Sequence, residues 1–160
     1  MRTIETTVYK FEELSEPIRD KIIQDFYDIN LDYYHWWKNV YCDAENAGLR
    51  IIGFDIDRGA HCAMEFIDSA EAAAELIIKN HGHQCDTHRI ALRYTTAHAA
   101  LSPDQQEDLS EDMSKEFSEE LAGAYLSLLR QEYEYLTSEE AISDTIRAND
   151  YEFTAEGRLI

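Results

Sequence analysis

The sequence LRIIGFDIDRGAHCAMEF, residues 49–66, holds two runs in which apolar side chains recur beside polar ones, on either side of a turn signal. Leu49, Ile51 and Phe54 belong to the first run, and alternation near a period of two is typical of a strand with one buried face. Between the runs, Asp57-Arg58-Gly59 supplies residue types that tight turns favour. The stretch therefore predicts a β-hairpin with strands over residues 49–57 and 60–66.

Helical patterns flank this hairpin on both sides. Apolar residues spaced three and four apart, preceded by N-cap residues or an early proline, indicate amphipathic helices. They predict helices over residues 16–29 and 32–42, from residue 70 toward 82, a long helix from 103 past 129, and a short one from 139 to 149. Residues 84–100 fit either a helix or a strand, and a helix is favoured.

Both ends of the chain carry strand-like patterns. Residues 3–11 combine apolar side chains with Thr and Tyr, which are enriched in strands. Residues 151–160 carry apolar side chains around Glu156-Gly157, which predicts a tight hairpin with glycine at a positive φ. The order of elements predicts an α+β fold, in which several helices, one of them long and acidic, pack on a small antiparallel sheet.

Length and composition limit the organisation and the class of the protein. The 160 residues, 44% of them hydrophobic, suit one domain with its own core, so we expect a single domain over residues 1–160. No run of 18 apolar residues occurs, and residues 1–7 lack the apolar run of a signal peptide. Three widely spaced cysteines are typical of free thiols in a reducing compartment. We therefore expect a cytoplasmic protein.

The charge is strongly acidic, with 33 Asp and Glu against 14 Lys and Arg and a formal net charge of −19. Proteins bind nucleic acid and anionic membranes through basic surfaces, so we expect neither as a direct partner. Eight carboxylates recur three and four residues apart along the long predicted helix: Asp104, Glu107, Asp108, Glu111, Asp112, Glu116, Glu119 and Glu120. This spacing indicates either a solvated helix face or a DNA-mimicking surface that occupies a basic groove of a partner.

A second candidate site consists of residues with zinc-binding side chains: His61, Cys62, His83, Cys85 and His88. Their spacing matches no C-x₂-C pair and no His-Glu-x-x-His helix. Surface histidines and buried cysteines explain the same residues, and an enzyme would also need a carboxylate, such as Glu65 or Asp86, near an open metal position. The pattern thus favours a protein without a cofactor, with a zinc site as the alternative.

Aromatic residues concentrate in residues 33–41, where Tyr34 and Trp37 are expected nearest to the surface. Rings at helical spacing more often belong to a core, whereas exposed Trp and Tyr dominate interface hot spots. We interpret the block mainly as core, with Tyr34 and Trp37 as candidate partner-binding residues. Asp55 and Asp57 alternate along a strand, but a hairpin tip explains them better than acid–base catalysis does.

Four segments carry a resemblance to a known family: Tyr9–Ser15, Asp32–Trp37 with Val40-Tyr41, Gly53–Gly59, and Tyr151–Thr154 with Gly157. They resemble segments of small acidic proteins of phages and prophages that are loosely labelled antitoxin-like. The resemblance implies the cytoplasm of a bacterial host as the setting, and it brings no catalytic residues to this chain.

Together, these observations predict a non-enzymatic, phage-type protein that inhibits or neutralises a bacterial host protein with a basic groove. The expected target is an antiphage defence effector, such as a restriction or CRISPR component, or a toxin. The alternative is a small zinc-dependent enzyme or nucleotide-binding protein that uses the His and Cys residues, although no GxxxxGK[ST] or GxGxxG loop occurs in the sequence. Self-association into a homo-oligomer through the aromatic face is a third alternative.

Overall fold

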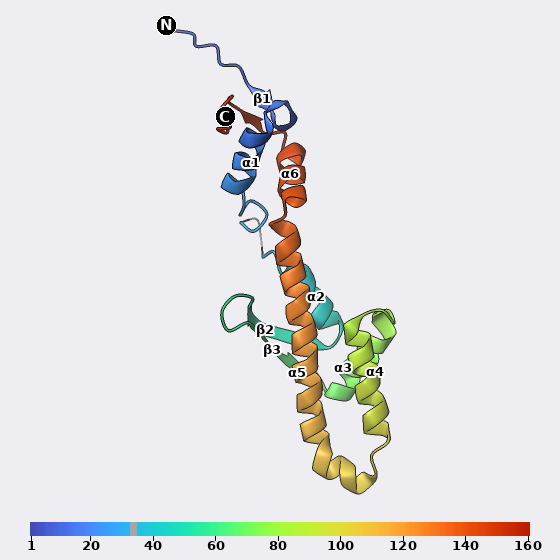
Figure 1. Ribbon diagram of the computed structural model, residues 1–160. Coiled ribbons are helices and arrows are strands. Elements are labelled where there is room, and N and C mark those ends of the chain that lie inside the picture. Colours follow the sequence, from blue (N-terminus) through green and yellow to red (C-terminus); the bar gives the residue numbers. More distant parts are fainter. Residues whose placement is uncertain (33–34) are drawn as a thin grey trace. The chain divides into compact units, whose positions relative to one another are not determined.

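The computed structural model describes residues 1–32 and 35–160 (Figure 1). The chain forms two compact units, which are described separately below. We call Trp37–Gln131 the central unit, and Met1–Trp36 with Glu132–Ile160 the terminal unit. The expectation of a single domain over residues 1–160 stays a prediction.

The central unit contains the predicted hairpin. Strands β2 (Leu49–Asp55) and β3 (His61–Phe66) pair antiparallel, with Leu49 opposite Phe66 and Ile51 opposite Met64. A β-bulge between Ile51 and Gly53 adds one residue to β2, so that Phe54 returns to the same face as Leu49 and Ile51. The hairpin is confirmed, and the bulge explains why the apolar alternation in the sequence skips one position.

The other elements of the central unit are helices: α2 (Lys38–Asn46), α3 (Ala70–Asn80), α4 (Asp86–Ala99) and α5 (Pro103–Leu136), whose residues from Glu132 onward belong to the terminal unit. The helix favoured for residues 84–100 is therefore confirmed as α4. Ser69 is the N-cap of α3, because its hydroxyl accepts a hydrogen bond of 3.1 Å from the Ala72 N–H.

The core of the central unit lies between the hairpin and these helices. Its largest fully buried side chains are Leu49, Ile77, Leu121, Tyr125 and Leu129. Within it, the Phe117 ring of α5 stacks on the Tyr94 ring of α4, at a centroid distance of 4.3 Å and an interplanar angle of 7°. On the hairpin side, Phe117 stacks on Phe66 of β3 at 5.7 Å. One aromatic column therefore joins β3, α5 and α4.

The terminal unit brings together the two ends of the chain. It contains β1 (Tyr9–Lys10), the 3₁₀ helix η1 (Phe11–Glu13), α1 (Glu16–Asp25), α6 (Glu139–Ala148) and β4 (Glu152–Phe153). β1 and β4 pair antiparallel, with Tyr9 opposite Phe153. The core of this unit consists of Phe11, Leu14, Ile22, Ile142, Ile146 and Phe153.

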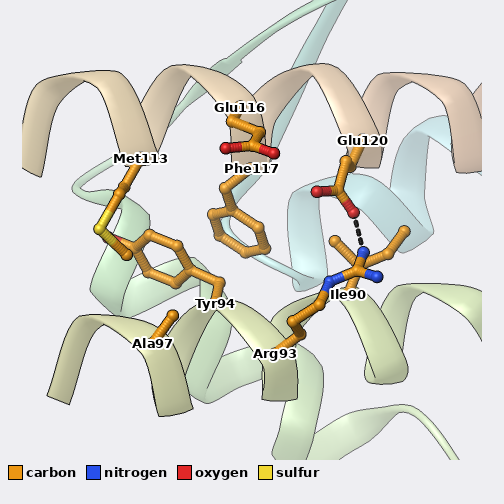
Figure 2. Close-up of a pocket in the computed structure, with 8 residues that line it drawn as sticks. All are labelled: Ile90, Arg93, Tyr94, Ala97, Met113, Glu116, Phe117 and Glu120. Carbon is orange, nitrogen blue, oxygen red and sulfur yellow. Dashed lines mark hydrogen bonds and ion pairs between the residues drawn. The ribbon is translucent and has the colours of Figure 1, made fainter. Parts of the chain in front are cut away.

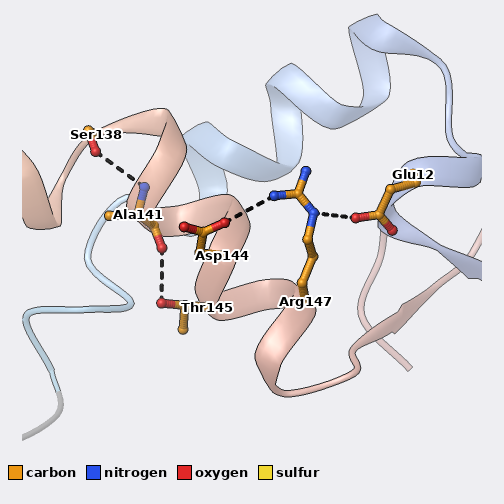
Figure 3. A network of polar contacts seen from close by, with 6 residues as sticks. All are labelled: Glu12, Ser138, Ala141, Asp144, Thr145 and Arg147. Carbon is orange, nitrogen blue, oxygen red and sulfur yellow. Dashed lines mark hydrogen bonds and ion pairs between the residues drawn. The ribbon is translucent and has the colours of Figure 1, made fainter.

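Polar contacts around α6 support this packing (Figure 3). The Arg147 guanidinium pairs with Glu12 of η1 and, at 3.2 Å, with Asp144 one turn earlier on α6. This guanidinium also lowers the pKa of the Glu12 carboxyl by hydrogen bonding to its charged form. At the start of α6, the Ser138 hydroxyl accepts a hydrogen bond of 3.2 Å from the Ala141 N–H, as expected for an N-cap.

The strand predicted over residues 3–11 is wrong for most of its length, because only Tyr9–Lys10 pairs with another strand. Its partner β4 has just two residues, so the ladder extends no further. Ile4 and Val8 accordingly stay 84% and 40% exposed. Their residue types favour a strand, but the described residues of the terminal unit offer no sheet face that would bury them.

The first two predicted helices are shorter than expected. The first ends at Asp25 instead of residue 29, although Phe26 and Ile29 still pack against the core and so prolong the apolar spacing in the sequence. The second helix begins at Lys38 instead of residue 32. Tyr33 and Tyr34 lie outside the described residues, and the prediction of Tyr34 as a partner-binding residue falls there.

The hairpin predicted at the C-terminal end is shorter than expected, because its two arms are joined by a single β-bridge. β4 is followed by a bridge between Phe153 and Leu159, and Gly157 lies at the turn with φ +80°. The described residues thus form six α-helices and two antiparallel two-stranded sheets, so the α+β fold class is confirmed.

Candidate functional site

Carboxylates crowd the first half of α5, which begins at Pro103. Within the described part of the chain, seven of the eight predicted residues are exposed and make no ion pair or side-chain hydrogen bond: Asp104, Glu107, Asp108, Glu111, Asp112, Glu116 and Glu119. Glu120 is 33% exposed and pairs with Arg93 of α4. The structure therefore leaves most of this charge without a neutralising neighbour.

These carboxylates do not form a single row. At about 100° of rotation for each residue, their positions extend over more than half of the helix circumference. Residues such as Asp108 and Glu119 lie on the side of α5 opposite Phe117, which is buried against α4. Glu116 and Glu120 instead lie at the edge that faces α4. The eight carboxylates thus form a broad acidic surface on α5, which we call the acidic sleeve. Two of them, Glu116 and Glu120, border a hollow.

This hollow of about 210 Å³ lies between α4 and α5 (Figure 2). Its lining is supplied by four residues of each helix: Ile90, Arg93, Tyr94, Ala97, Met113, Glu116, Phe117 and Glu120. Tyr94 and Phe117 are only 6% and 2% exposed, whereas the charged ends of Arg93 and Glu120 meet at the rim. The hollow therefore has apolar walls and a charged mouth.

The predicted zinc ligands are not gathered into one cluster. His61 and Cys62 are neighbours on β3 and point to opposite faces, so that His61 is exposed and Cys62 is buried. The rings of His83 and His88 do meet, with centroids 4.7 Å apart. Over residues 1–32 and 35–160, however, no group of three or more His, Cys, Asp and Glu side chains is arranged to hold a metal ion.

The two cysteines among these candidates differ in their surroundings. Burial raises the pKa of the Cys62 thiol to about 11, so that the thiol is protonated at neutral pH. Cys85 is half-buried and occupies the N-cap position of α4 without capping it through its side chain. A thiol like that of Cys62 is a poor nucleophile and a poor metal ligand, which agrees with its interpretation as a core residue.

A polar network that was not expected from the sequence links four segments of the central unit. The Tyr125 hydroxyl of α5 donates a hydrogen bond of 2.8 Å to one oxygen of Asp43 on α2. The other oxygen of Asp43 lies 3.4 Å from Nε2 of His81, whose Nδ1 lies 2.6 Å from the Thr87 hydroxyl on α4. Nearby, Nδ1 of the buried His88 lies 2.9 Å from the carbonyl oxygen of His81.

The order Asp43, His81, Thr87 places a carboxylate, an imidazole and a hydroxyl in a chain of the kind that activates a nucleophile. Thr87, however, is only 4% exposed, so its hydroxyl is closed to a substrate. The network instead joins α2, α4 and α5 and satisfies their buried polar groups. Sequence reasoning missed it because its members lie far apart along the chain and match no motif.

No family model matches this chain, and comparison with the curated proteins and with the solved structures found no match. The resemblance to small acidic phage proteins therefore stays a prediction. In the part of the chain that the structure describes, no helix combines the length and the apolar character needed to cross a membrane.

Of the two aromatic residues predicted to bind a partner, Tyr34 and Trp37, the structure describes Trp37, whose side chain is half-buried. Its ring lies 5.7 Å from Phe54 of β2 and 6.4 Å from Tyr41 of α2. At the hairpin tip, an oxygen of Asp55 accepts a hydrogen bond of 2.7 Å from the Asp57 N–H, as in turns that begin with aspartate. Both arrangements agree with the structural interpretations of these residues.

Replacing Tyr125 with phenylalanine tests the polar network. We expect a loss of about 1 kcal/mol in the free energy of unfolding at pH 7, because one buried hydrogen bond disappears while the ring remains. Burial, followed by the hydrogen bond to Asp43, raises the pKa of Tyr125 well above its ordinary value of 10.0. The measurement is urea unfolding, followed by circular dichroism, of both proteins between pH 7 and pH 11.

The pH dependence of the unfolding free energy distinguishes the contribution of the Tyr125 hydroxyl from that of its ring. Above pH 10, the unfolded chain releases the Tyr125 proton while the folded chain keeps it, so this contribution to stability falls as the pH rises. The Tyr125→Phe protein lacks this contribution, so the difference between the two proteins should shrink above pH 10. A constant difference up to pH 11 would contradict the assignment, and the other tyrosines cancel because both proteins contain them.

Proposed function

We propose that this protein acts without catalysing a reaction, by placing the acidic sleeve of α5 in a basic or nucleic-acid-binding groove of a bacterial host protein. The observation that carries the proposal is the set of seven exposed carboxylates on residues 104–119, beside the single cation Lys115. Like charges three and four residues apart destabilise a helix by about 0.2–0.5 kcal/mol for each pair. This crowding gives the fold no benefit, which supports a role in binding.

The setting of the proposal comes from the resemblance to small acidic phage and prophage proteins. It suggests the cytoplasm of an infected bacterium, and as target an antiphage defence effector or a toxin. Electrostatic attraction between the sleeve and a basic groove would speed the encounter and make binding sensitive to salt. A protein of this kind would inhibit its target by excluding the nucleic acid that the groove normally binds.

The experiment begins with capture of proteins from a bacterial lysate on the immobilised chain at low salt, followed by elution with a salt gradient. The affinity of the purified captured protein is then measured for the wild type and for a variant with four reversals: Glu111→Lys, Asp112→Lys, Glu116→Lys and Glu119→Lys. Each reversal replaces an attraction of about 0.2–1 kcal/mol by a repulsion of similar size, so we expect the affinity to fall at least tenfold. The loss should be largest at low salt.

The matched control carries the same change of net charge, spread over exposed carboxylates elsewhere: Glu45→Lys, Glu75→Lys, Glu139→Lys and Glu140→Lys. It should keep its affinity within about threefold, because these residues lie outside the sleeve. Equal losses in both variants would show that only the net charge matters. The proposal would be rejected if every protein that salt elutes from the wild-type column also bound to a column carrying the α5 variant. It would also be rejected if salt eluted no protein from the wild-type column.

A further inference from the structure

The hollow between α4 and α5 combines apolar walls with carboxylates at its mouth, inside the acidic sleeve. We propose that it receives one arginine side chain of the partner protein, and this inference rests on the proposed function. All of its lining residues belong to the central unit, and the two helices that supply them are held together by the stacked rings of Tyr94 and Phe117. The site is therefore part of a packed framework.

The size of the hollow argues for a single side chain. Sites for small organic molecules usually measure about 300–1,000 Å³, and the hollow has about 210 Å³. Its lining includes the buried rings of Tyr94 and Phe117 and apolar groups of Ile90, Ala97 and Met113, which suit the three methylene groups of an arginine. Arginine is also among the residues that most often act as anchors at the centre of protein interfaces.

The charges at the mouth favour a cation. Glu116 is exposed and makes no ion pair or side-chain hydrogen bond with any described residue. One helical turn further along α5, Glu120 pairs with Arg93, whose side chain is 68% exposed. The mouth thus holds two carboxylates, Glu116 and Glu120, and one cation, Arg93, which gives it a net charge of −1 beside apolar walls. A guanidinium has planar N–H donors that match carboxylate oxygens in pairs, which a lysine ammonium does not offer.

Arg93 provides the free protein with a guanidinium at this position. Its pairing with Glu120 is solvent-exposed and therefore weak, so an arriving guanidinium can replace it. In the complex, the partner's arginine would contact Glu116 and Glu120, and Arg93 would turn into the solvent. This competition gives the inference a distinctive consequence, because removing Arg93 should strengthen binding while removing Glu116 should weaken it.

The test uses N-acetyl-argininamide as the probe and the methionine methyl groups as reporters in NMR spectra. The chain has three methionines, of which Met113 lines the hollow, whereas Met64 lies on β3 and Met1 is exposed at the N-terminal end. We expect the Met113 methyl signal to shift to saturation during a titration while those of Met1 and Met64 stay in place. N-acetyl-citrullinamide, which has nearly the same shape without the charge, should give no saturating shift.

Variants of the full chain then separate local pairing from general electrostatics. Glu116→Gln should weaken binding of the probe about fivefold, and Glu107→Gln, which removes the same charge elsewhere on α5, should change it less than twofold. Arg93→Gln should strengthen binding about threefold. Its matched control is Arg89→Gln, which removes another exposed cation from α4. Arg89 pairs with Asp86 and does not line the hollow.

Equal effects of Arg93→Gln and Arg89→Gln, or saturation by the citrulline compound, would overturn the inference. So would a titration in which the Met113 signal does not move. Because these measurements need no partner protein, they are independent of the test of the proposed function. Binding of the probe without capture of a basic partner would reject the proposed function alone, and capture that is unaffected by Glu116→Gln would reject the arginine site alone.

Discussion

Replacing Phe117 with alanine is expected to lower the free energy of unfolding by about 3–5 kcal/mol. Phe117 is only 2% exposed, and its ring is stacked between those of Tyr94 and Phe66. Alanine would remove both contacts and leave a cavity next to the hollow, because the rings of β3 and α4 belong to separate elements and cannot both move inward. Urea unfolding followed by circular dichroism measures the loss.

A matched control comes from the same helix. Leu109 of α5 is 42% exposed, so Leu109→Ala should cost less than about 1 kcal/mol. The variant Phe117→Leu, which retains much of the apolar volume, should fall between the two. If Phe117→Ala cost no more than Leu109→Ala, the aromatic column would not contribute to holding α4, α5 and the hairpin together.

The second large effect is expected in the terminal unit, from Gly157→Ala. Gly157 has φ +80°, a conformation that costs residues with a side chain about 1 kcal/mol. A Cβ atom there would lie 2.9 Å from Cγ2 of Ile18 and 3.1 Å from Cγ1 of Ile22. Because Ile22 is fully buried, this overlap adds about 1–3 kcal/mol, and we expect a total loss of about 2–4 kcal/mol.

A control at Gly59, at the tip of the central hairpin, distinguishes the backbone strain from the steric overlap. It has φ +76°, and no atom lies within 4 Å of a Cβ built on it. Gly59→Ala should therefore show the backbone effect alone, about 1 kcal/mol. Thermal unfolding of both variants gives the comparison. If the two losses were equal, the C-terminal turn would not be packed against α1 as closely as the structure shows.

Local signals made much of the fold predictable. The hairpin around Asp57-Arg58-Gly59, the capped helix after Ser69 and the long helix that begins at Pro103 each depend on turn residues, caps and apolar spacing within one segment. The failures occurred where a distant partner decides the outcome. Residues 3–11 have the composition of a strand, but their pairing depends on β4, more than 140 residues away, and β4 is too short to pair with more than two of them.

The candidate site divides in the same way. The carboxylates of the acidic sleeve could be identified from their spacing on a helix. The hollow could not, because it exists only where Tyr94 and Phe117 stack and where Arg93 meets Glu120 across 27 residues of sequence. Likewise, the network of Tyr125 with its partners joins segments that share no motif.

The amino-acid sequence by itself determined the charge of this protein, the type of most of its elements and the crowding of carboxylates on α5, because propensity, capping and periodicity act over a few residues. Only the tertiary structure decided which carboxylates stand free, which of them meets a cation and where an apolar hollow opens beside them. Those features depend on how α4 and α5 pack side by side, and such packing is set by side chains that are remote in the sequence.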